Sequence, residues 1–182
     1  AIDQLMEDAY MVEERMMLSG SGVKAGKTVA EGTALNDIVI HRTGALSVVS
    51  LIVYVNGEYL NTFRADGIIL STPTGSTGYN MSAGGPIVDP KAEMLLITPI
   101  NAHNLNSRSI VVGAEDEVVV EIGERRSQKD EMVEVSFDGD NAVRLEVGDR
   151  FMIRKAKHTA RICKLSKKSF LEILSKKMQA YT

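Results

Sequence analysis

The chain has 182 residues, a 44% share of hydrophobic residues and a formal net charge of −3. This length suits one domain or slightly more, and the hydrophobic share is sufficient for a core. The charge argues against general nucleic-acid binding, which usually needs a basic surface, and the sequence contains no apolar run of transmembrane length.

The N-terminal segment carries little that identifies a compartment. The chain opens on Ala1 without an initiator Met, as a trimmed protein or a piece of a longer one would, and it shows no signal peptide.

The chain has a single cysteine, Cys163, which excludes an internal disulfide and favours a reducing compartment. Because Cys163 lies in a strand-like run, we expect its thiol to be buried and structural.

The first elements predicted are a helix, a strand and a long loop. Apolar residues in 2–9 recur at helical spacing, and residues 10–18 are typical of an exposed strand. Residues 19–33 are polar and rich in glycine, which predicts a loop. Within it, residues 21–28 nearly match a phosphate-binding P-loop, but Ser21 stands where the first glycine belongs and no buried strand precedes it. We therefore expect an exposed hairpin loop.

From residue 34 onward the pattern is β-rich. Many short apolar runs joined by Gly, Asn and Asp turns predict a mainly β fold, a β-sandwich or a related two-sheet arrangement. The predicted strands cover residues 36–41, 48–55, 58–63, 66–71, 94–100, 110–112, 117–122, 132–137, 142–146, 150–154 and 159–165. The pairs Asn56-Gly57 and Asp138-Gly139 are strong signals for tight hairpin turns. Residues 124–131 are charged, which predicts a solvated loop.

The chain ends in a predicted amphipathic helix at 166–179. Ser166 or Ser169 is expected to cap its N-terminus. Its apolar stripe consists of Phe170, Leu171, Ile173, Leu174 and Met178. A helix this amphipathic needs an apolar surface to cover, either on the β domain or on another domain.

The most distinctive stretch is residues 71–86, Ser-Thr-Pro-Thr-Gly-Ser-Thr-Gly-Tyr-Asn-Met-Ser-Ala-Gly-Gly-Pro. A predicted buried strand leads into it, and Gly75 and Gly78 lack the Cβ atoms that would keep a ligand away. Residues 77–83 are expected to form a short helix whose first N–H groups point back at the loop. The stretch thus predicts a cradle for a phosphate or another polar ligand. A surface turn that ends at residues 84–86 is the alternative.

Other polar residues lie at the ends of predicted strands. Asn36 and Asp37 open a strand, and their side chains suit the vicinal hydroxyls of a ribose, although a strand-entry cap is the alternative. Arg64 and Asp66 lie just before or at the start of the strand that leads into residues 71–86, which makes them candidate site residues. The alternative is that they form a surface ion pair. The three histidines, His41, His103 and His158, show no metal-ligand spacing, and there is no Cys/His cluster. His103 follows the strand at 94–100 and is either a site residue at the sheet end or a plain loop histidine.

These motifs together resemble the C-terminal domain of NAD kinase, the enzyme that phosphorylates the 2′-hydroxyl of the adenosine ribose of NAD. The resemblance covers nearly all of residues 1–182. It is carried by residues 12–18, 34–37, 64–67, 71–86 and 98–100, with His103 and Arg108 behind them. The stretch 71–86 is the most specific part. Asp37 stands where the family usually has Glu, and Gly78 where it usually has Ala.

The resemblance implies a fold and a set of site residues. The fold implied is the second, β-sandwich domain of the two-domain plan that NAD kinases share with diacylglycerol kinases. Asn36 and Asp37 are implied to contact the ribose, Asp66 the nicotinamide end and Tyr79 the adenine, with Ser82 near the amide. The complete set implied for NAD binding is Asn36, Asp37, Arg64, Asp66, Thr77, Gly78, Tyr79, Asn80, Met81, Ser82 and Asp140.

The resemblance also implies partners. Family members are commonly cytoplasmic homo-oligomers, dimers or tetramers, that use ATP, or in some cases polyphosphate, with a divalent metal such as Mg²⁺. Their N-terminal α/β domain carries a Gly-Gly-Asp-Gly-Thr motif whose Asp is the proposed catalytic base, and no Gly-Asp-Gly-Thr occurs here. Phosphoryl transfer needs the donor, the metal and the acceptor held together. We therefore expect this chain to supply NAD binding and to be inactive alone.

The terminal helix at 166–179 is then expected to pack on the missing N-terminal domain, which would leave Leu171 and Leu174 exposed in this chain.

Three alternatives to an NAD kinase domain stay open. A lipid kinase of the diacylglycerol type would need a loop fitted to a glycerol lipid, whereas Asn36, Asp37 and Tyr79 favour a dinucleotide. A non-catalytic nucleotide-binding or assembly module would bind nucleotide without kinase activity. A structural β domain would bind no nucleotide at all.

Overall fold

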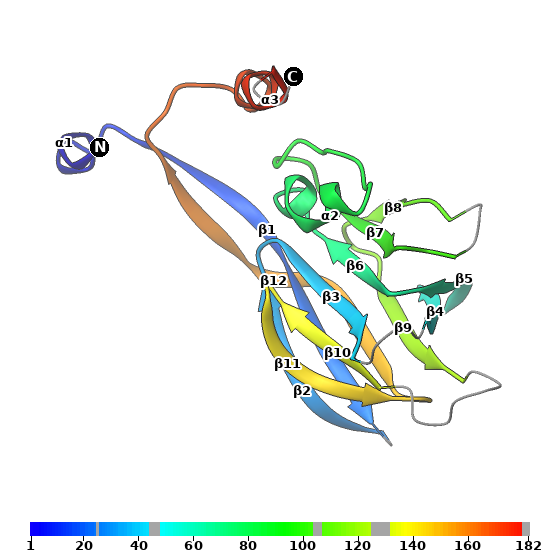
Figure 1. The fold of residues 1–182 in the computed structure, drawn as a ribbon. Coiled ribbons are helices and arrows are strands. Elements are labelled where there is room, and N and C mark those ends of the chain that lie inside the picture. The colour runs from blue at the N-terminus through cyan, green and yellow to red at the C-terminus, as the bar shows by residue number, and fades with distance from the viewer. Residues whose placement is uncertain (25, 44–47, 104–106, 125–131, 180–182) are drawn as a thin grey trace.

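The computed structural model describes residues 1–24, 26–43, 48–103, 107–124 and 132–179, and it confirms the predicted β-sandwich (Figure 1). Sheet A has the strand order β2-β1-β12-β9-β4-β5, and sheet B has the order β11-β10-β3-β6-β7-β8. The strands are β1 (Met11–Lys24), β2 (Lys27–Ala34), β3 (Asp37–Arg42), β4 (Val49–Val55), β5 (Glu58–Ala65), β6 (Gly67–Ser71), β7 (Met94–Ile100), β8 (Ile110–Gly113), β9 (Val118–Gly123), β10 (Met132–Phe137), β11 (Asp140–Glu146) and β12 (Arg150–Lys164). All their pairings are antiparallel.

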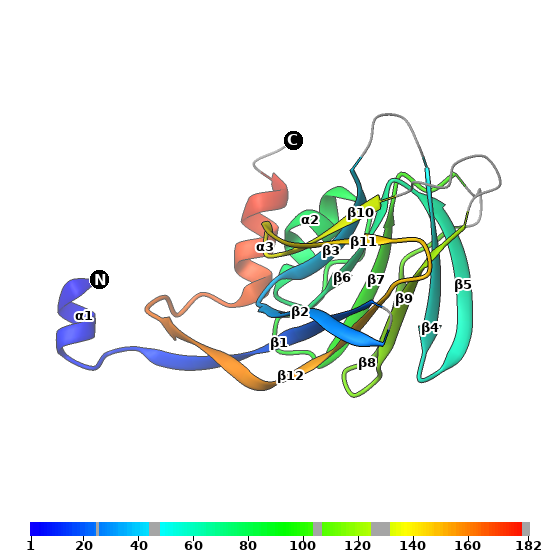
Figure 2. The same ribbon diagram turned by 90° about the horizontal axis from the view of Figure 1, so that it is seen from below.

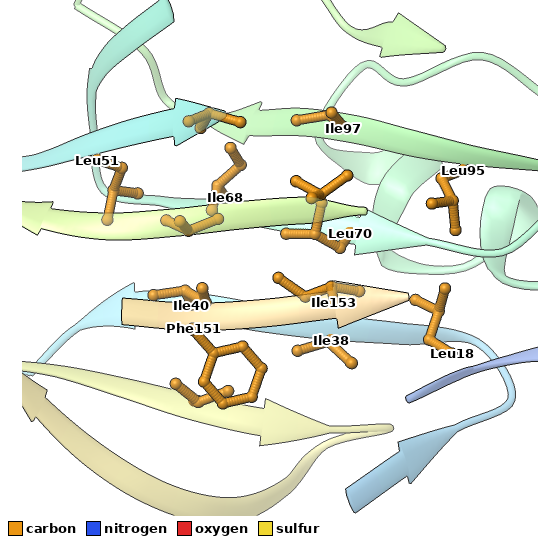
Figure 3. Packing of buried hydrophobic residues seen from close by; sticks show 14 of the residues in the cluster. Leu18, Ile38, Ile40, Leu51, Ile68, Leu70, Leu95, Ile97, Phe151 and Ile153 are labelled. Carbon is orange, nitrogen blue, oxygen red and sulfur yellow. The ribbon is translucent and has the colours of Figure 1, made fainter. Parts of the chain in front are cut away.

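The main core lies between the two sheets, where alternate residues of each strand point inward. Figure 3 shows Leu18, Phe151 and Ile153 of sheet A facing Ile38 and Ile40 of sheet B. All five side chains are fully buried. Burial of a side chain of this size contributes about 1.5–3 kcal/mol relative to exposure, so this layer supplies much of the stability.

The glycine-rich segment at 19–33 is mostly strand, so the predicted long loop is wrong although the predicted hairpin is confirmed. β1 and β2 pair over nearly all of it, and the turn lies at Gly26, where φ is +75°. Gly20 and Gly22 face the ring of Phe151, and a Cβ on Gly20 would lie 2.7 Å from that ring. Gly20 therefore makes room for an aromatic side chain. Because no helix follows, residues 21–28 do not form a P-loop.

A single long strand replaces the two predicted at 150–154 and 159–165. β12 runs without a break, and its outer part pairs only with the start of β1, residues 11–16 with 159–164. We call this pair of segments the β1–β12 ribbon. β2 joins β1 only from Leu18 onward, and β9 joins β12 only over residues 150–153. No further strand among the described residues pairs with the ribbon, and the thiol of Cys163 is exposed, so its predicted burial is wrong.

Both helices at the chain ends lie outside the sandwich (Figures 1 and 2). α1 (Ile2–Met6) begins where the N-terminal helix was predicted but ends before residue 9, and α3 (Phe170–Gln179) begins later than predicted. Ser169 caps α3 as expected, because its Oγ accepts the N–H of Glu172 while its own N–H donates to the Glu172 carboxylate. Leu171 is 69% exposed, and Leu174 is half-buried.

Within the described part of the chain, no helix is long and apolar enough to span a membrane. The charged loop predicted at 124–131 lies almost entirely outside the described residues.

Candidate functional site

A loop lies over part of the outer face of sheet B. It carries the distinctive stretch 71–86 and contains a 3₁₀ turn, η1 (Gly75–Thr77), and a short helix, α2 (Tyr79–Ser82), separated by Gly78. Ala83, just after α2, packs on an apolar cluster of Val39, Ile69 and Ile100. β6 is consequently buried along its whole length, which explains its continuous apolar sequence.

Asn80 holds this loop together from inside. Its side chain is fully buried, and its Nδ2 donates to the carbonyl oxygens of Ser76 at 3.1 Å and Pro86 at 3.0 Å. Its Oδ1 accepts the hydroxyl of Thr98, on β7, at 2.7 Å. Asn80 thereby ties the two ends of the loop to each other and to the sheet.

The backbone turn at residues 35–37, which we call the 35–37 turn, is held from two sides. On one side the hydroxyl of Thr72 donates to the carbonyl of Leu35 at 2.6 Å, and the Thr72 N–H donates to the carbonyl of Asn36 at 2.9 Å. On the other side the carboxylate of Asp138 accepts backbone N–H groups of the same turn. The turn therefore has little freedom to move relative to the loop.

The open remainder of the outer face of sheet B forms a groove with a volume of about 810 Å³. Val39 and Ile100 contribute apolar floor, and the loop that carries residues 74–79 forms one wall. The lining residues are Asn36, Asp37, Val39, His41, Arg42, Asp66, Thr74, Thr77, Gly78, Tyr79, Ile100, Asn101, Ser136, Asp138 and Gly139. An apolar floor with polar groups converging around it is typical of a small-molecule site.

One side of the groove carries the carboxylate of Asp66, which accepts hydrogen bonds from two neighbouring side chains. The Nδ2 of Asn101 donates to Asp66 Oδ2 at 3.0 Å, and the Nε of Arg42 donates to Asp66 Oδ1 at 2.9 Å. The hydrogen bond from Asn101, followed by that from Arg42, holds the pKa of Asp66 below its ordinary value. Asp66 is therefore ionised at neutral pH and fixed in orientation.

The pKa of Asp37, a second carboxylate in the groove, is shifted in the opposite direction from that of Asp66. Asp37 is 7% exposed, and its carboxylate has no hydrogen-bond partner among the described residues. Burial, and then the nearby charge of Asp138, raise the pKa of Asp37 to about 6. An acceptor that is only weakly solvated and otherwise unpaired is well suited to the hydroxyl group of a ligand.

Replacement of Asp37 by asparagine is expected to stabilise the fold at pH 7.5 by on the order of 1–2 kcal/mol, because a buried charge disappears. The raised pKa means that the native state binds more protons than the unfolded state between about pH 4 and 6. The contribution of Asp37 to stability therefore falls as pH rises through its folded pKa. The gain from Asp37→Asn should shrink towards pH 4. Urea unfolding at pH 4.5, 6 and 7.5 measures the difference.

Asp89→Asn is the control, because Asp89 is an exposed turn residue whose Oδ1 accepts the N–H of Lys91. It should show no comparable gain at pH 7.5. A gain from Asp37→Asn that is independent of pH would contradict the raised pKa.

Thr74 adds a hydroxyl that the protein itself leaves unsatisfied. Its Oγ1 is buried and has no hydrogen-bond partner in the structure, and Thr74 lines the groove. A buried polar atom of this kind costs free energy unless a ligand or water completes its hydrogen bond. Among the described residues, no group of three His, Cys, Asp or Glu side chains is placed to hold a metal ion. The groove thus offers hydrogen bonds, charge and apolar surface.

The structure brings together about half of the predicted site residues. Asn36, Asp37, Asp66, Thr77, Gly78 and Tyr79 line the groove, although they come from well-separated parts of the chain. The others do not line it: Arg64, Asn80, Met81, Ser82 and Asp140. Arg64 lies exposed on β5 and Asp140 is exposed at the start of β11, while Asn80 is buried inside the loop. Whether these five contact a ligand stays a prediction.

Two further residues were singled out in the sequence. The backbone N–H of His103 donates to the carbonyl of Arg64 at 2.9 Å, and its side-chain charge helps to lower the pKa of Asp66. Arg108 lines a separate, smaller cavity of about 480 Å³ with Ser107. Thr74 and Asp138 also line the groove but were not in the set implied for NAD binding, although both stand inside motifs that the sequence identified.

Comparisons with known proteins agree with one another. The ATP-NAD kinase C-terminal domain family matches residues 35–165. A curated NAD kinase from Agathobacter rectalis is 60% identical over all of this chain, which spans 63% of that protein. A crystal structure of yeast NADH kinase complexed with NADH superposes with a TM-score of 0.86 at 26% identity, covering 98% of this chain and 51% of the kinase. An Archaeoglobus fulgidus NAD kinase in complex with ATP gives a TM-score of 0.77 at 27% identity, covering 96% and 63%.

Proposed function

Since the chain belongs to the ATP-NAD kinase C-terminal domain family, we propose that it is the NAD-binding part of an enzyme that phosphorylates the 2′-hydroxyl of the adenosine ribose of NAD to give NADP. The observation that carries this proposal is the convergence of Asp37, Asp66 and Tyr79 on one groove. These residues belong to three separate motifs of the family signature. The yeast NADH kinase was crystallised as a complex with NADH, which supports a dinucleotide as the occupant of the groove.

The chemistry of the groove suits the parts of a dinucleotide. Tyr79 is 47% exposed at the groove, where its ring is available to pack against a flat adenine base. Asn36 offers amide donors and an acceptor, and Asp37 offers an acceptor for ribose hydroxyls. The unsatisfied hydroxyl of Thr74 is available to a polar atom of the ligand. Asp66, fixed by Arg42 and Asn101, is our candidate for the nicotinamide end.

Phosphate transfer is proposed to need more than this chain. The chain spans about 63% of the length of the curated relative that is 60% identical to it. We place ATP or polyphosphate, a divalent metal such as Mg²⁺, and the catalytic base on the part of the kinase that this chain does not span. The residues described here would bind the acceptor and present its hydroxyl, a positioning task that accounts for much of phosphoryl-transfer catalysis.

α3 is the proposed docking element for that other part. Leu171, Ile173 and Met178 are 69%, 39% and 62% exposed, and no residue of α3 is buried. An apolar stripe of this width is costly in water unless a partner covers it. Assembly into a dimer or tetramer, as expected from the family, remains a proposal as well.

A calorimetric titration with NAD tests the proposal. The chain is expected to bind NAD, and Asp66→Ala is expected to weaken binding at least about tenfold, because it removes a fixed, ionised acceptor from the groove. Glu121→Ala is the matched control. Glu121 also accepts a hydrogen bond from an arginine, Arg150, at 2.8 Å, but it lies on β9 in sheet A, outside the groove. A cooperative thermal unfolding transition in each variant serves as the check that the variant is folded.

The titration also separates the alternatives. If the chain extended by the N-terminal part of the kinase binds no NAD and shows no kinase activity, the proposal is wrong and a structural β domain is favoured. Binding of NAD without kinase activity in that extended chain favours a non-catalytic nucleotide-binding module. Phosphorylation of diacylglycerol by the extended chain would identify a lipid kinase.

A further inference from the structure

We propose that Asp138 is the positioning residue of the NAD site: it fixes the 35–37 turn, and through it Asn36 and Asp37, in the geometry that receives the ligand. This inference rests on the proposed function of the groove. It assigns a role to a residue that the sequence marked only as part of a hairpin turn.

The carboxylate of Asp138 is almost entirely used by the turn. Its Oδ2 accepts the N–H of Leu35 at 2.7 Å. Its Oδ1 accepts the N–H of Asn36 at 2.7 Å and that of Asp37 at 3.0 Å. The backbone N–H of Asp138 returns a hydrogen bond to the carbonyl of Asp37 at 3.0 Å. Hydrogen bonds from N–H groups to a carboxylate are stronger than those between neutral groups, so this side of the turn is firmly held.

The opposite side of the 35–37 turn faces the loop of residues 71–86. Thr72 and Ser71 donate from their hydroxyls to the carbonyls of Leu35 and Asn36. The carbonyl groups of Leu35 and Asn36 are therefore bound to the loop of residues 71–86, and the N–H groups of residues 35–37 are bound to Asp138. Asp138 thus joins the β10–β11 hairpin to the 35–37 turn, which lies about 100 residues away in the sequence, and the turn in turn is bound to the loop wall of the groove.

The backbone at Asp138 restricts which residue can do this. Its φ is +50°, a left-handed conformation that aspartate and asparagine tolerate better than most residues. Asparagine therefore preserves the backbone and keeps one acceptor oxygen, but it places an amide where the second oxygen was. Alanine removes both acceptors and adds strain. The two substitutions form a graded series.

The test measures amide hydrogen exchange by NMR and NAD affinity by calorimetry on the same proteins. For Asp138→Asn, we expect faster exchange of the amides of residues 35–37 and NAD binding that is about tenfold to a hundredfold weaker than wild type. Asp138→Ala should be more severe in both measurements. Asp116→Asn is the control, because Asp116 likewise accepts a turn N–H, that of Gly113 at 2.7 Å, at a place remote from the groove.

The outcomes are distinct. Unchanged NAD affinity in Asp138→Asn, with the wild type binding NAD, overturns the inference. Unchanged exchange at residues 35–37 overturns it as well, and so does an equal loss of affinity in Asp116→Asn. If the wild type binds no NAD even when extended by the rest of the kinase, the proposed function fails instead. In that case the exchange data still decide whether Asp138 fixes the turn.

Discussion

Replacement of Gly75 by alanine is expected to lower the free energy of unfolding by roughly 3 kcal/mol or more and to abolish NAD binding. A Cβ at this position would lie 2.1 Å from the carbonyl oxygen of Asn36 and 2.7 Å from the Oγ of Ser71. Both neighbours belong to the hydrogen-bonded contact between the loop and the 35–37 turn, so neither moves without breaking that contact. The loop and the turn must separate.

Differential scanning calorimetry measures this effect. For a chain of this length each kcal/mol corresponds to roughly 2–4 °C in Tm, so a decrease of about 10 °C is expected. Gly22→Ala is the control, because Gly22 is also buried but a Cβ there would meet Phe151 at 3.4 Å, an ordinary contact distance. A Gly75→Ala protein with unchanged Tm and unchanged NAD affinity would show that the loop does not touch the turn in solution.

Replacement of Asn80 by aspartate is the second change with a large expected effect, a loss of about 3 kcal/mol at pH 7.5. The substitution keeps the size of the side chain and the acceptor for Thr98. It removes both N–H donors and sets a carboxylate against the carbonyl oxygens of Ser76 and Pro86. Because Asn80 is fully buried, water cannot replace these hydrogen bonds. The loop should detach from sheet B, and NAD binding should weaken with it.

Urea unfolding and an NAD titration check this prediction together. Asn61→Asp is the matched control, since the Oδ1 of Asn61 accepts the N–H of Thr62 at 2.9 Å and an aspartate keeps that hydrogen bond. Its stability should stay within about 0.5 kcal/mol of wild type. An equal loss in both variants would mean that the cost comes from added negative charge and not from the position of Asn80 in the loop.

Most of the sheet structure could be predicted from the sequence, because local patterns decide it. β7 and β10 have the predicted bounds, Met94–Ile100 and Met132–Phe137. The turns at Asn56-Gly57 and Asp138-Gly139 have positive φ at both residues, as tight hairpins of these sequences require. In each case a run of apolar residues or a pair of adjacent residues carries the whole signal.

The errors arose where the partner lies far away in the sequence. Gly20 and Gly22 were predicted to lie in a loop, whereas they stand opposite Phe151, which is about 130 residues distant. Cys163 has a strand-like sequence, but its exposure depends on the absence of a third strand beside the described ribbon. The role of Asp138 depends on the 35–37 turn in the same way. Such tertiary packing overrides local preference.

The β1–β12 ribbon brings the entry and the exit of the sandwich together. The chain enters the sandwich along β1 and leaves along β12, and the two strands are hydrogen-bonded neighbours where they do so. The helix before β1 and the residue after β12 are also adjacent, with Gln4 Nε2 donating to the carbonyl of Leu165 at 3.4 Å. Such a unit can be spliced between two residues of a host chain without stretching the host, because its entry and exit points already coincide.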